Sequence, residues 1–390
     1  MTTPQNRFFM ALVVLAIAAS GVLCWRIERS PAIRHNETGK ILYTDLAGRK
    51  VWIKKDVQKI VLLRSKDIYL LAALLGDELP KRLVAWGPDL KLDDSEFCKR
   101  LLEKFPRLRD ITVTGDVYGD GLNVEQLAQI DADLIIADKF MLDRGFHYTE
   151  KLDATGLPVV YLDGSADPLI APQKGLLFLG QVLQKEKRAN EIAGFINAQI
   201  NPILARIATN APAAPAVYLE AGLLGPQQYG QTYGFSGVEK NQTSWGAILE
   251  ALKVRNIAQG RVVGMAPINP EALLKADPDV IVITGQNWSR FKNPGSMQLG
   301  FNVNAAEARQ LLNGFIARPG WNLLAAVKNK NVHGIFHNTI SPTIFSGVQA
   351  LAKDCYPDLF RDVEPDKNLR EFYDRFMPVA LDGTWSCAIE

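Results

Sequence analysis

The chain has 390 residues, of which 47% are hydrophobic and 22% charged, and its 44 basic and 42 acidic side chains give a net charge of +2. This length exceeds one ordinary core and suits two domains, and the composition is that of a globular protein. The near-neutral balance gives no support to nucleic-acid binding or to adsorption on an acidic membrane surface, so we expect no nucleic-acid partner.

The amino terminus differs from the rest of the chain. Arg7 precedes an uncharged apolar run, Phe8 to Ser20, which closes on small residues. This layout is typical of an export signal, so residues 1–25 are predicted to be a signal peptide. An uncleaved anchor over residues 8–25 is the first alternative, because that run just reaches the length that spans a bilayer. Lipid attachment at Cys24 is a lesser alternative. Each predicts that the rest of the chain is exported to the periplasm.

Residues 41–166 alternate between strand and helix patterns. A Gly-containing turn between the apolar runs 41–45 and 50–53 predicts a β-hairpin. The alternation that follows predicts an α/β lobe with a largely parallel sheet. The expected strands are 59–63, 82–86 and 158–163, and the expected helices are 67–75, 95–104 and 147–155.

Residues 167–210 carry no strand pattern. Apolar residues recur there at helical spacing in two stretches, and the second predicts a long helix, 187–208, that Pro202 kinks or ends early. Such a helix between two lobes would be a stiff connector. A second lobe with a C-terminal tail is predicted over 211–390. Its expected strands are 216–222 and 331–337, and its expected helices are 244–258, 305–315, 321–327, 343–354 and 368–376.

One unit occurs twice, once in each predicted lobe. NVEQLAQIDADLIIAD at 123–138 and NPEALLKADPDVIVIT at 269–284 share an Asn, a Glu two residues on, an Asp ten residues on, and then four apolar residues. In each copy the Asn is predicted to cap a short helix, and Glu125 or Glu271 falls in its first turn, where the helix dipole favours negative charge. A buried strand follows. Two similar α/β lobes are therefore expected.

The ordered set of segments resembles the periplasmic substrate-binding proteins of ABC importers for iron–siderophore complexes, haem and cobalamin. The resemblance implies two Rossmann-like lobes with mainly parallel sheets, bridged by a long rigid helix, with the ligand between the lobes. It also implies that Glu125 and Glu271 dock against Arg residues of the membrane permease. The matching segments, between Ile41 and Phe360, are TDLAGRKVWI, KIVLL, NVEQLAQIDADLIIAD, GLPVVYLD, the long mid-chain helix, SWGAILEALKVRNIA, NPEALLKADPDVIVITG, AAVKNKNVHGIF and SGVQALAKDCYPDLF.

The loops after the predicted strands are where a ligand is expected, because ligands of parallel α/β sheets bind beyond the carboxyl ends of the strands. Aromatic rings and Arg suit a bulky, planar, often anionic iron chelate, since rings supply contact area and Arg supplies paired donors to oxygen. Each residue taken alone is more readily explained by packing or as a surface charge. The candidates are Trp86, Tyr118, Met141 and Arg144 in the first lobe and Tyr229, Tyr233, Trp288, Arg290 and His337 in the second.

The His residues argue against a metal site, whereas the Cys residues leave a disulfide open. The four His are scattered, whereas a receptor for bare zinc or manganese would concentrate His and carboxylates, so no metal site is expected. Cys355 and Cys387 are candidates for a disulfide that ties the tail to the second lobe, and free buried thiols are the alternative.

The function indicated is that of a non-enzymatic, exported, monomeric receptor. It would capture an iron complex, a ferric siderophore in the first instance, and pass it to an ABC permease and its ATPase, with no cofactor of its own. Cobalamin, haem or an oxyanion such as molybdate are alternatives within the same fold. A periplasmic metal-chelate enzyme is the alternative of another class, but the sequence holds no GxSxG, GxxxxGKS/T, GxGxxG or HExxH motif.

Overall fold

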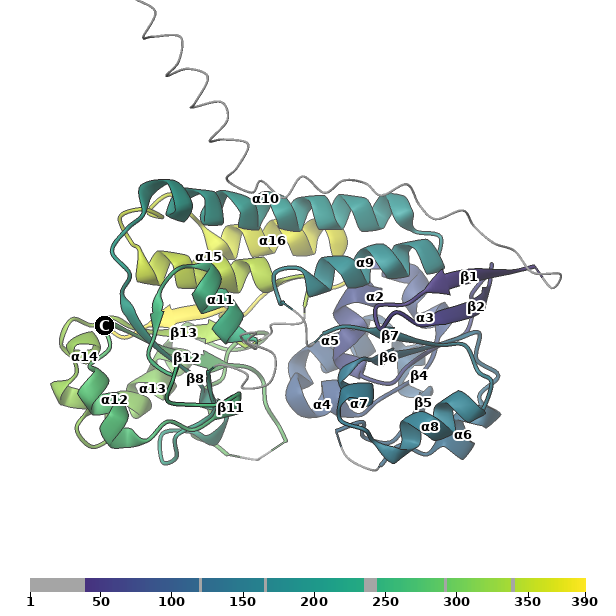
Figure 1. The fold of residues 1–390 in the computed structure, drawn as a ribbon, viewed down its shortest axis with the longest axis horizontal. Helices are drawn as coiled ribbons and strands as arrows, with labels where there is room; N and C mark the ends of the chain where they lie inside the picture. The colour runs from purple at the N-terminus through teal and green to yellow at the C-terminus, as the bar shows by residue number, and fades with distance from the viewer. Residues whose placement is uncertain (1–38, 119–120, 165–166, 235–243, 291–292, 338–340) are drawn as a thin grey trace, which may run out of the picture.

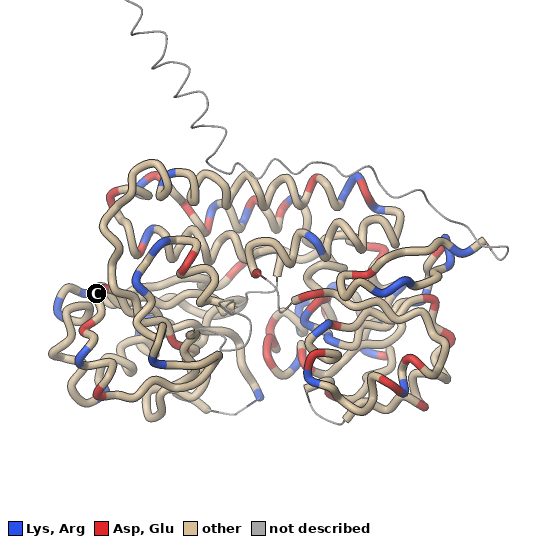
Figure 2. Tube along the Cα trace, viewed as in Figure 1, with Lys and Arg blue, Asp and Glu red and all other residues tan. Residues whose placement is uncertain are grey.

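In the computed structural model, two α/β lobes lie side by side beneath a layer of long helices (Figure 1). The structure describes residues 39–118, 121–164, 167–234, 244–290, 293–337 and 341–390. The signal or anchor predicted over residues 1–25 lies outside these ranges. Within them, no helix combines the length and the hydrophobicity needed to cross a bilayer. Figure 2 shows basic and acidic residues interspersed over both lobes, in keeping with the small net charge.

The first lobe is built on a five-stranded parallel sheet in the order β5-β4-β3-β6-β7, and β1 and β2 form the predicted hairpin. Successive residues of a strand face opposite sides of its sheet. In β3, Ile60 and Leu62 therefore join one apolar cluster and Val61 the other, so both faces of the sheet are buried. The elements are β1 Lys40–Thr44, β2 Lys50–Lys54, β3 Ile60–Leu62, α2 Ile68–Leu75, α3 Leu79–Arg82, β4 Leu83–Trp86, α4 Asp89–Asp93, α5 Ser95–Lys104, β5 Thr112–Val113, α6 Val124–Gln129, β6 Leu134–Asp138, α7 Phe140–Asp143, α8 His147–Ala154 and β7 Val159–Leu162.

The second lobe has a mixed seven-stranded sheet in the order β11-β9-β8-β12-β13-β14, with β10 beside β8. Its centre, β8, β12 and β13, is parallel as expected. Its margins are antiparallel, because β9 and β14 run against β8 and β13. The elements are β8 Ala216–Ala221, β9 Thr232–Tyr233, α11 Trp245–Ala251, β10 Arg255–Asn256, β11 Met265–Ala266, α12 Pro270–Ala276, β12 Val280–Gly285, α13 Ala305–Ile316, α14 Ala325–Lys328, β13 Val332–Phe336, α15 Ile344–Cys355, α16 Pro365–Phe376 and β14 Ser386–Ala388.

The repeated unit forms the same structure in both lobes. The Asn123 side chain accepts a hydrogen bond from the Gln126 N–H at 2.9 Å and caps α6. The Asn269 side chain accepts from the Ala272 N–H at 3.1 Å and caps α12. Every residue of the strands that follow, β6 and β12, is buried. The predicted helix–turn–strand units are confirmed.

Two helices, α9 (Ala171–Val182) and α10 (Glu186–Asn210), join the lobes. α10 packs against α9 and α2 on the first lobe and against α15 and α16 on the second, so it bridges both. The prediction that Pro202 could end this helix early was wrong. Pro202 removes a single backbone donor, and Ile200, Ile203 and Ile207 stay buried on either side of it, so packing holds the helix together through that point.

The C-terminal tail is held to the second lobe by backbone pairing rather than by a disulfide. Cys355 and Cys387 are both free in the structure, so the suggested bridge is not formed. Cys355 ends α15, whereas Cys387 lies in β14 opposite Gly334 of β13. The Cys387 sulfur sits 2.8 Å from where a Cβ on Gly334 would be, so the thiol fills the space over this glycine.

A row of aromatic rings makes the hydrophobic core continuous between the two lobes. Phe97 of α5 stacks on Tyr69 of α2 with ring centroids 4.0 Å apart, and it lies 5.6 Å from Phe301 of the second lobe. Phe301 in turn meets Trp385 of the tail at 5.2 Å. One apolar cluster therefore includes buried residues of both lobes and of the connecting helices.

Candidate functional site between the lobes

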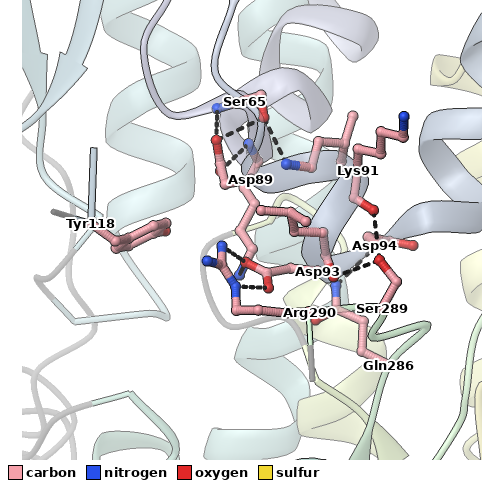
Figure 3. Close-up of polar contacts among 12 residues, drawn as sticks. Ser65, Asp89, Lys91, Asp93, Asp94, Tyr118, Gln286, Ser289 and Arg290 are labelled. Atoms are coloured by element: carbon pink, nitrogen blue, oxygen red, sulfur yellow. Dashed lines mark hydrogen bonds and ion pairs between the residues drawn. The ribbon is translucent and has the colours of Figure 1, made fainter. Parts of the chain in front are cut away.

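The segment that follows β12 in the second lobe lies directly against α4 and the start of α5 in the first (Figure 3). The backbone N–H groups of Ser289 and Arg290 both donate to the Leu92 carbonyl, at 2.9 and 3.0 Å. The Ser95 N–H donates to the Asn287 carbonyl at 3.3 Å. Because these bonds start where β12 ends and reach the helices that follow β4, the carboxyl ends of the two sheets face each other here.

Arg290 is the centre of a charged cluster at this junction. Its Nε donates to Asp93 Oδ1 at 2.8 Å and its Nη2 to Asp93 Oδ2 at 3.2 Å, while Nη1 reaches Asp116 Oδ2 at 3.3 Å. Lys66 Nζ pairs with the same Asp93 at 2.9 Å. Burial alone would raise the pKa of Asp93, but Lys66 and Arg290 outweigh it and hold that pKa below its usual range. The guanidinium also lies over the Tyr118 ring, 5.7 Å from its centroid.

A second charged group sits at the carboxyl edge of the first sheet. Arg64, two residues after β3, is only 5% exposed and lies 2.6 Å from both Asp67 Oδ1 and Asp138 Oδ2. Asp138, the last residue of β6, also accepts from the Gly164 N–H at 2.9 Å. A Cβ at position 164 would come within 2.3 Å of the Arg64 guanidinium, so a larger residue there would have to displace this side chain.

Three aromatic rings lie around a histidine at the end of β13. His337 follows β13, and its Nδ1 lies 2.7 Å from the Thr284 hydroxyl of β12. The imidazole centroid is 5.4 Å from the ring centroid of Trp288, 6.3 Å from that of Tyr233 and 6.4 Å from that of Trp245. Burial, aided by the charge of Lys66 and opposed by that of Asp93, lowers the pKa of His337 to about 3. The imidazole is therefore neutral at ordinary pH.

The cationic side chains of this region already pair with carboxylates. Arg64 pairs with Asp67 and Asp138, and Lys66 and Arg290 share Asp93. Among the residues that the structure describes, no group of three or more His, Cys, Asp and Glu could hold a bare metal ion. The arrangement therefore offers aromatic area, a neutral imidazole and neutralised charges.

Residues 82–336 match the family model described as "Periplasmic binding protein". The chain belongs to the periplasmic binding protein family.

Relatives of this periplasmic binding protein agree with that assignment. It is similar to the solved structure of the TroA-like periplasmic binding protein FepB from Veillonella parvula, with 32% identity and a TM-score of 0.80 over 90% of this chain and 99% of that one. It is 22% identical over 338 residues to the uncharacterized ABC transporter substrate-binding lipoprotein YvrC of Bacillus subtilis (strain 168), covering 85% of this chain and 91% of the relative. It is 21% identical over 362 residues to the molybdate-binding protein MolA of Haemophilus influenzae, covering 86% and 90%.

This periplasmic binding protein is the extracytoplasmic solute-binding component of an ABC transporter, and its family is non-enzymatic. The family and the fold class expected from the sequence are confirmed. The alternative of a metal-chelate enzyme rested on the general two-lobed plan. The family match accounts for that plan, so this alternative has no remaining support.

The structure brings five of the predicted ligand residues of this periplasmic binding protein to the junction, namely Tyr118, Tyr233, Trp288, Arg290 and His337. Tyr118 comes from the first lobe and the others from the second. Tyr118 keeps 43% of its surface exposed, and Trp288 and His337 are half-buried. These three side chains therefore remain open to a ligand.

The other four predicted residues lie elsewhere. Met141 is fully buried in the core of the first lobe, and Trp86, the last residue of β4, is 6% exposed within the larger core. Arg144 is exposed at the end of α7. The Tyr229 hydroxyl accepts from the Trp321 indole N–H at 2.9 Å, and Arg318 lies over its ring. Local packing accounts for Met141, Trp86 and Tyr229.

Sequence reasoning missed Arg64, Lys66, Asp93 and Thr284. Arg64 and Lys66 follow β3 closely, so the rule that selected loops after strands also applied to them. Thr284 stands inside a β-branched strand and reads as sheet core. Asp93 had no local signal, because its part depends on contacts with Lys66 and with Arg290 of the other lobe.

Proposed function

We propose that this protein captures an iron complex, a ferric siderophore in the first instance, between its lobes and delivers it to an ABC permease and its ATPase at the inner membrane. The observation that carries the proposal is the set of partly exposed rings at this junction, namely Tyr118 beneath the Arg290 guanidinium in one lobe and the neighbouring Trp288 and His337 in the other. Rings of this kind supply large contact area at low conformational cost, which suits a bulky planar chelate.

The charge arrangement supports a chelate over a small oxyanion. An oxyanion must gain most of its binding energy from donors that converge on it. Here Arg64, Lys66 and Arg290 already pair with carboxylates. A small anion would have to displace these carboxylates from the cations and would still lie close to their negative charge. A large chelate spreads its charge over many atoms and gains apolar contact as well. Molybdate remains the competitor to test, because one relative is named as molybdate-binding.

The repeated Glu residues support the delivery step. Glu125 and Glu271 are both exposed in the first turn of α6 and α12, one in each lobe. Figure 1 places both helices away from the α9 and α10 layer. A surface cavity of about 260 Å³ lies beside Glu125, lined by Leu122, Val124, His147, Tyr148 and Lys151. We expect permease Arg side chains to pair with the two carboxylates, and this cavity leaves room for such a side chain beside Glu125.

The first experiment is to identify the ligand. Protein purified natively from an exported preparation is analysed by mass spectrometry and absorbance, and then titrated by tryptophan fluorescence with ferric siderophores, haemin, cobalamin and molybdate. We expect quenching by a ferric chelate at micromolar concentration or below, and no response to molybdate. Tight binding of molybdate with no response to any iron complex would overturn the proposal.

A further inference from the structure

Carboxyl groups outnumber cations where the two lobes meet. Aspartates at or after the ends of β3, β4, β5 and β6 are connected to the cations described above through hydrogen bonds and ion pairs. Among the described residues, this connected group holds six carboxyl groups and three cations. The carboxyl groups belong to Asp67, Asp89, Asp93, Asp94, Asp116 and Asp138, and the cations are Arg64, Lys66 and Arg290.

Two of these carboxyl groups accept hydrogen bonds from neutral donors. Asp89 accepts from the N–H and the hydroxyl of Ser65 at 2.8 and 2.7 Å. Asp94 accepts from the Tyr69 hydroxyl at 2.6 Å and from the side-chain amide of Gln286, in the other lobe, at 3.3 Å. A neutral donor stabilises a carboxylate but leaves its negative charge in place. The excess of carboxyl groups is therefore an excess of charge.

Protonation does not reverse this balance. Burial raises the pKa of Asp67, and it raises that of Asp94 to about 6, so Asp94 is ionised at slightly alkaline pH. If both were protonated, four carboxylates would still face three cations. Lys91, the other cation of α4, directs its ammonium group away from Asp93 and Arg290 (Figure 3). The short segments outside the described ranges between residues 119 and 340 contain Asp120, Glu239, Lys240 and Lys292, whose charges cancel.

The negative charge acts on a ring that the ligand is expected to contact. Tyr118 keeps 43% of its surface exposed. Desolvation raises the pKa of its hydroxyl, Arg64 lowers it, and three carboxylates, those of Asp89, Asp93 and Asp67, raise it further. The carboxylates therefore influence the surface that faces the ligand as well as one another.

Asp116 is the most exposed charged side chain of this group. It is 34% exposed, compared with 25% for Arg290 and 24% for Lys66. Its carboxyl oxygens accept from the Tyr118 N–H at 3.0 Å and from Arg290 Nη1 at 3.3 Å, and Arg290 is shared with Asp93. A ligand that enters the junction thus meets a carboxylate more readily than it meets an unpaired cation.

We propose that the site selects iron complexes that are neutral or positively charged and rejects anionic ones. The inference rests on the proposed function, because it concerns the same ligand. An anion that enters the junction loses its water and finds each cation already paired, and it is repelled by the excess of carboxylates. The sequence alone suggested an anionic chelate held by Arg, but Arg290 is bound to Asp93 and Asp116.

One chelating core in three charge states tests this charge class. A linear trihydroxamate that ends in an amine forms a ferric complex with one positive charge. Acetylation of the amine makes the complex neutral, and succinylation gives it one negative charge, while the iron and its ligand oxygens stay the same. Haemin and the ferric complex of a tris-catechol chelator, both anionic, complete the panel. Calorimetric titration measures each affinity at low and at high salt.

We expect the amine-terminated complex to bind about tenfold more tightly than the succinylated one, or better, with the acetylated complex between them. Salt at about 0.5 M should reduce this ratio, because it screens charges. A steric effect of the succinyl group would not depend on salt in this way.

A matched pair of variants locates the effect. Asp116→Asn removes one negative charge and keeps an oxygen that accepts from the Tyr118 N–H. It should lower the ratio of the two affinities by about threefold. Asp358→Asn removes the same charge from an exposed pair with Arg361 and should leave the ratio unchanged.

The outcomes separate the two claims. Charge selection is refuted, while the receptor function stands, if the tightest iron complex is anionic or if the succinylated complex binds as tightly as the amine-terminated one. It is refuted as well if the ratio is unaffected by both salt and Asp116→Asn, because the preference would then arise from shape. If no iron complex binds the wild type, the proposed function fails and the charge selection fails with it.

Discussion

Arg290 in the second lobe holds Asp93 in the first through two parallel bonds, Nε to Oδ1 at 2.8 Å and Nη2 to Oδ2 at 3.2 Å. A guanidinium and a carboxylate that meet in this way form one of the stronger polar contacts in proteins. Both side chains are largely shielded, with 25% and 10% of their surface exposed. The contact therefore fixes the position of one lobe against the other at the site.

Replacing Arg290 should weaken the protein as well as the site. Arg290→Ala leaves the carboxylate of Asp93 with Lys66 alone, and we expect the free energy of unfolding to fall by about 1–3 kcal/mol. Arg290→Lys keeps the charge but cannot form both bonds, so its loss should be smaller. Urea unfolding measures both. Arg361→Ala is the control, because the Arg361–Asp358 pair is exposed, and it should change stability by less than ~0.5 kcal/mol. Equal losses of stability in the Arg290 and Arg361 variants would show that the Arg290–Asp93 contact does not stabilise the protein more than an exposed ion pair.

Replacing Arg318 should destabilise the protein more than replacing Arg290, because Arg318 forms a buried ion pair with Glu220. Arg318 contacts Glu220 at 2.7 and 2.9 Å, and the two side chains are 3% and 0% exposed. Arg318→Ala leaves a buried carboxylate whose other partners are the Tyr218 hydroxyl and the Gly230 N–H, so we expect a loss of about 3–5 kcal/mol. The double variant Glu220→Gln with Arg318→Met removes both charges and should recover part of it. A loss below ~1 kcal/mol for Arg318→Ala in denaturant unfolding would show that Arg318 is not needed to compensate the buried charge of Glu220.

Asp354 should make stability fall as pH rises. Burial raises the pKa of Asp354 from 3.8 to about 8, and burial lowers the pKa of neighbouring His333 to about 4. The Asp354 carboxyl lies 3.1 Å from His333 Nδ1, so a protonated Asp354 donates to a neutral imidazole. Between the two pKa values of Asp354 the folded state holds one proton more than the unfolded chain, and each pH unit upward costs up to about 1.4 kcal/mol.

The measurement is the melting temperature at pH 6.5 and at pH 8. This window lies at and above the ordinary His pKa of about 6.5, so unfolded His residues add little to it. Asp354→Asn keeps a donor for His333 and carries no titrating proton, so the fall between the two pH values should shrink in this variant. An identical fall in both proteins would rule out the protonated carboxyl.

Trp288 should matter for ligand binding and little for folding. Its ring lies beside His337 and is half-buried. An aromatic contact contributes about 0.5–1.5 kcal/mol beyond its buried area, so Trp288→Ala should weaken binding of the iron complex roughly tenfold. Calorimetric titration measures it, since Trp288→Ala also removes one of the seven tryptophans that would report binding by fluorescence. Trp52→Ala, at an exposed position in β2, should bind as wild type. A Trp288 variant with unchanged affinity would place the ligand elsewhere.

Reversing both repeated carboxylates should separate transport from binding. The double variant Glu125→Arg with Glu271→Arg should abolish ligand uptake by cells and leave the affinity of the purified protein unchanged. Glu307→Arg is the matched control, because Glu307 also stands in the first turn of an Asn-capped helix, α13, outside the repeated unit. Normal uptake by the double variant would end the docking assignment.

The sequence was sufficient to predict those elements whose structure depends on neighbouring residues. The Asn caps at 123 and 269, and the strands β6 and β12 that follow them, were predicted because capping and burial leave direct signals in neighbouring residues. Met141 shows the limit of that reasoning. It follows β6, as a ligand residue would, but the single turn of α7 directs its side chain into the core.

Contacts between distant segments could not be predicted in this way. Asp93 and Arg290 are almost two hundred positions apart. The residues next to either one in the sequence give no sign that the two side chains meet. The tail is a similar case. A cysteine in each segment suggested a disulfide, whereas β14 joins the sheet through backbone bonds, which any residue type can form.

The aromatic row through Tyr69, Phe97, Phe301 and Trp385 has a consequence for how the molecule can be engineered. Since apolar packing runs without a break from one lobe to the other, neither half is a self-contained module. A chimaera that combines one lobe of this protein with the other lobe of a relative would have mismatched rings at the seam. Exchange of ligand specificity among such proteins is therefore better sought by grafting the loops after β12 and β13 than by swapping lobes.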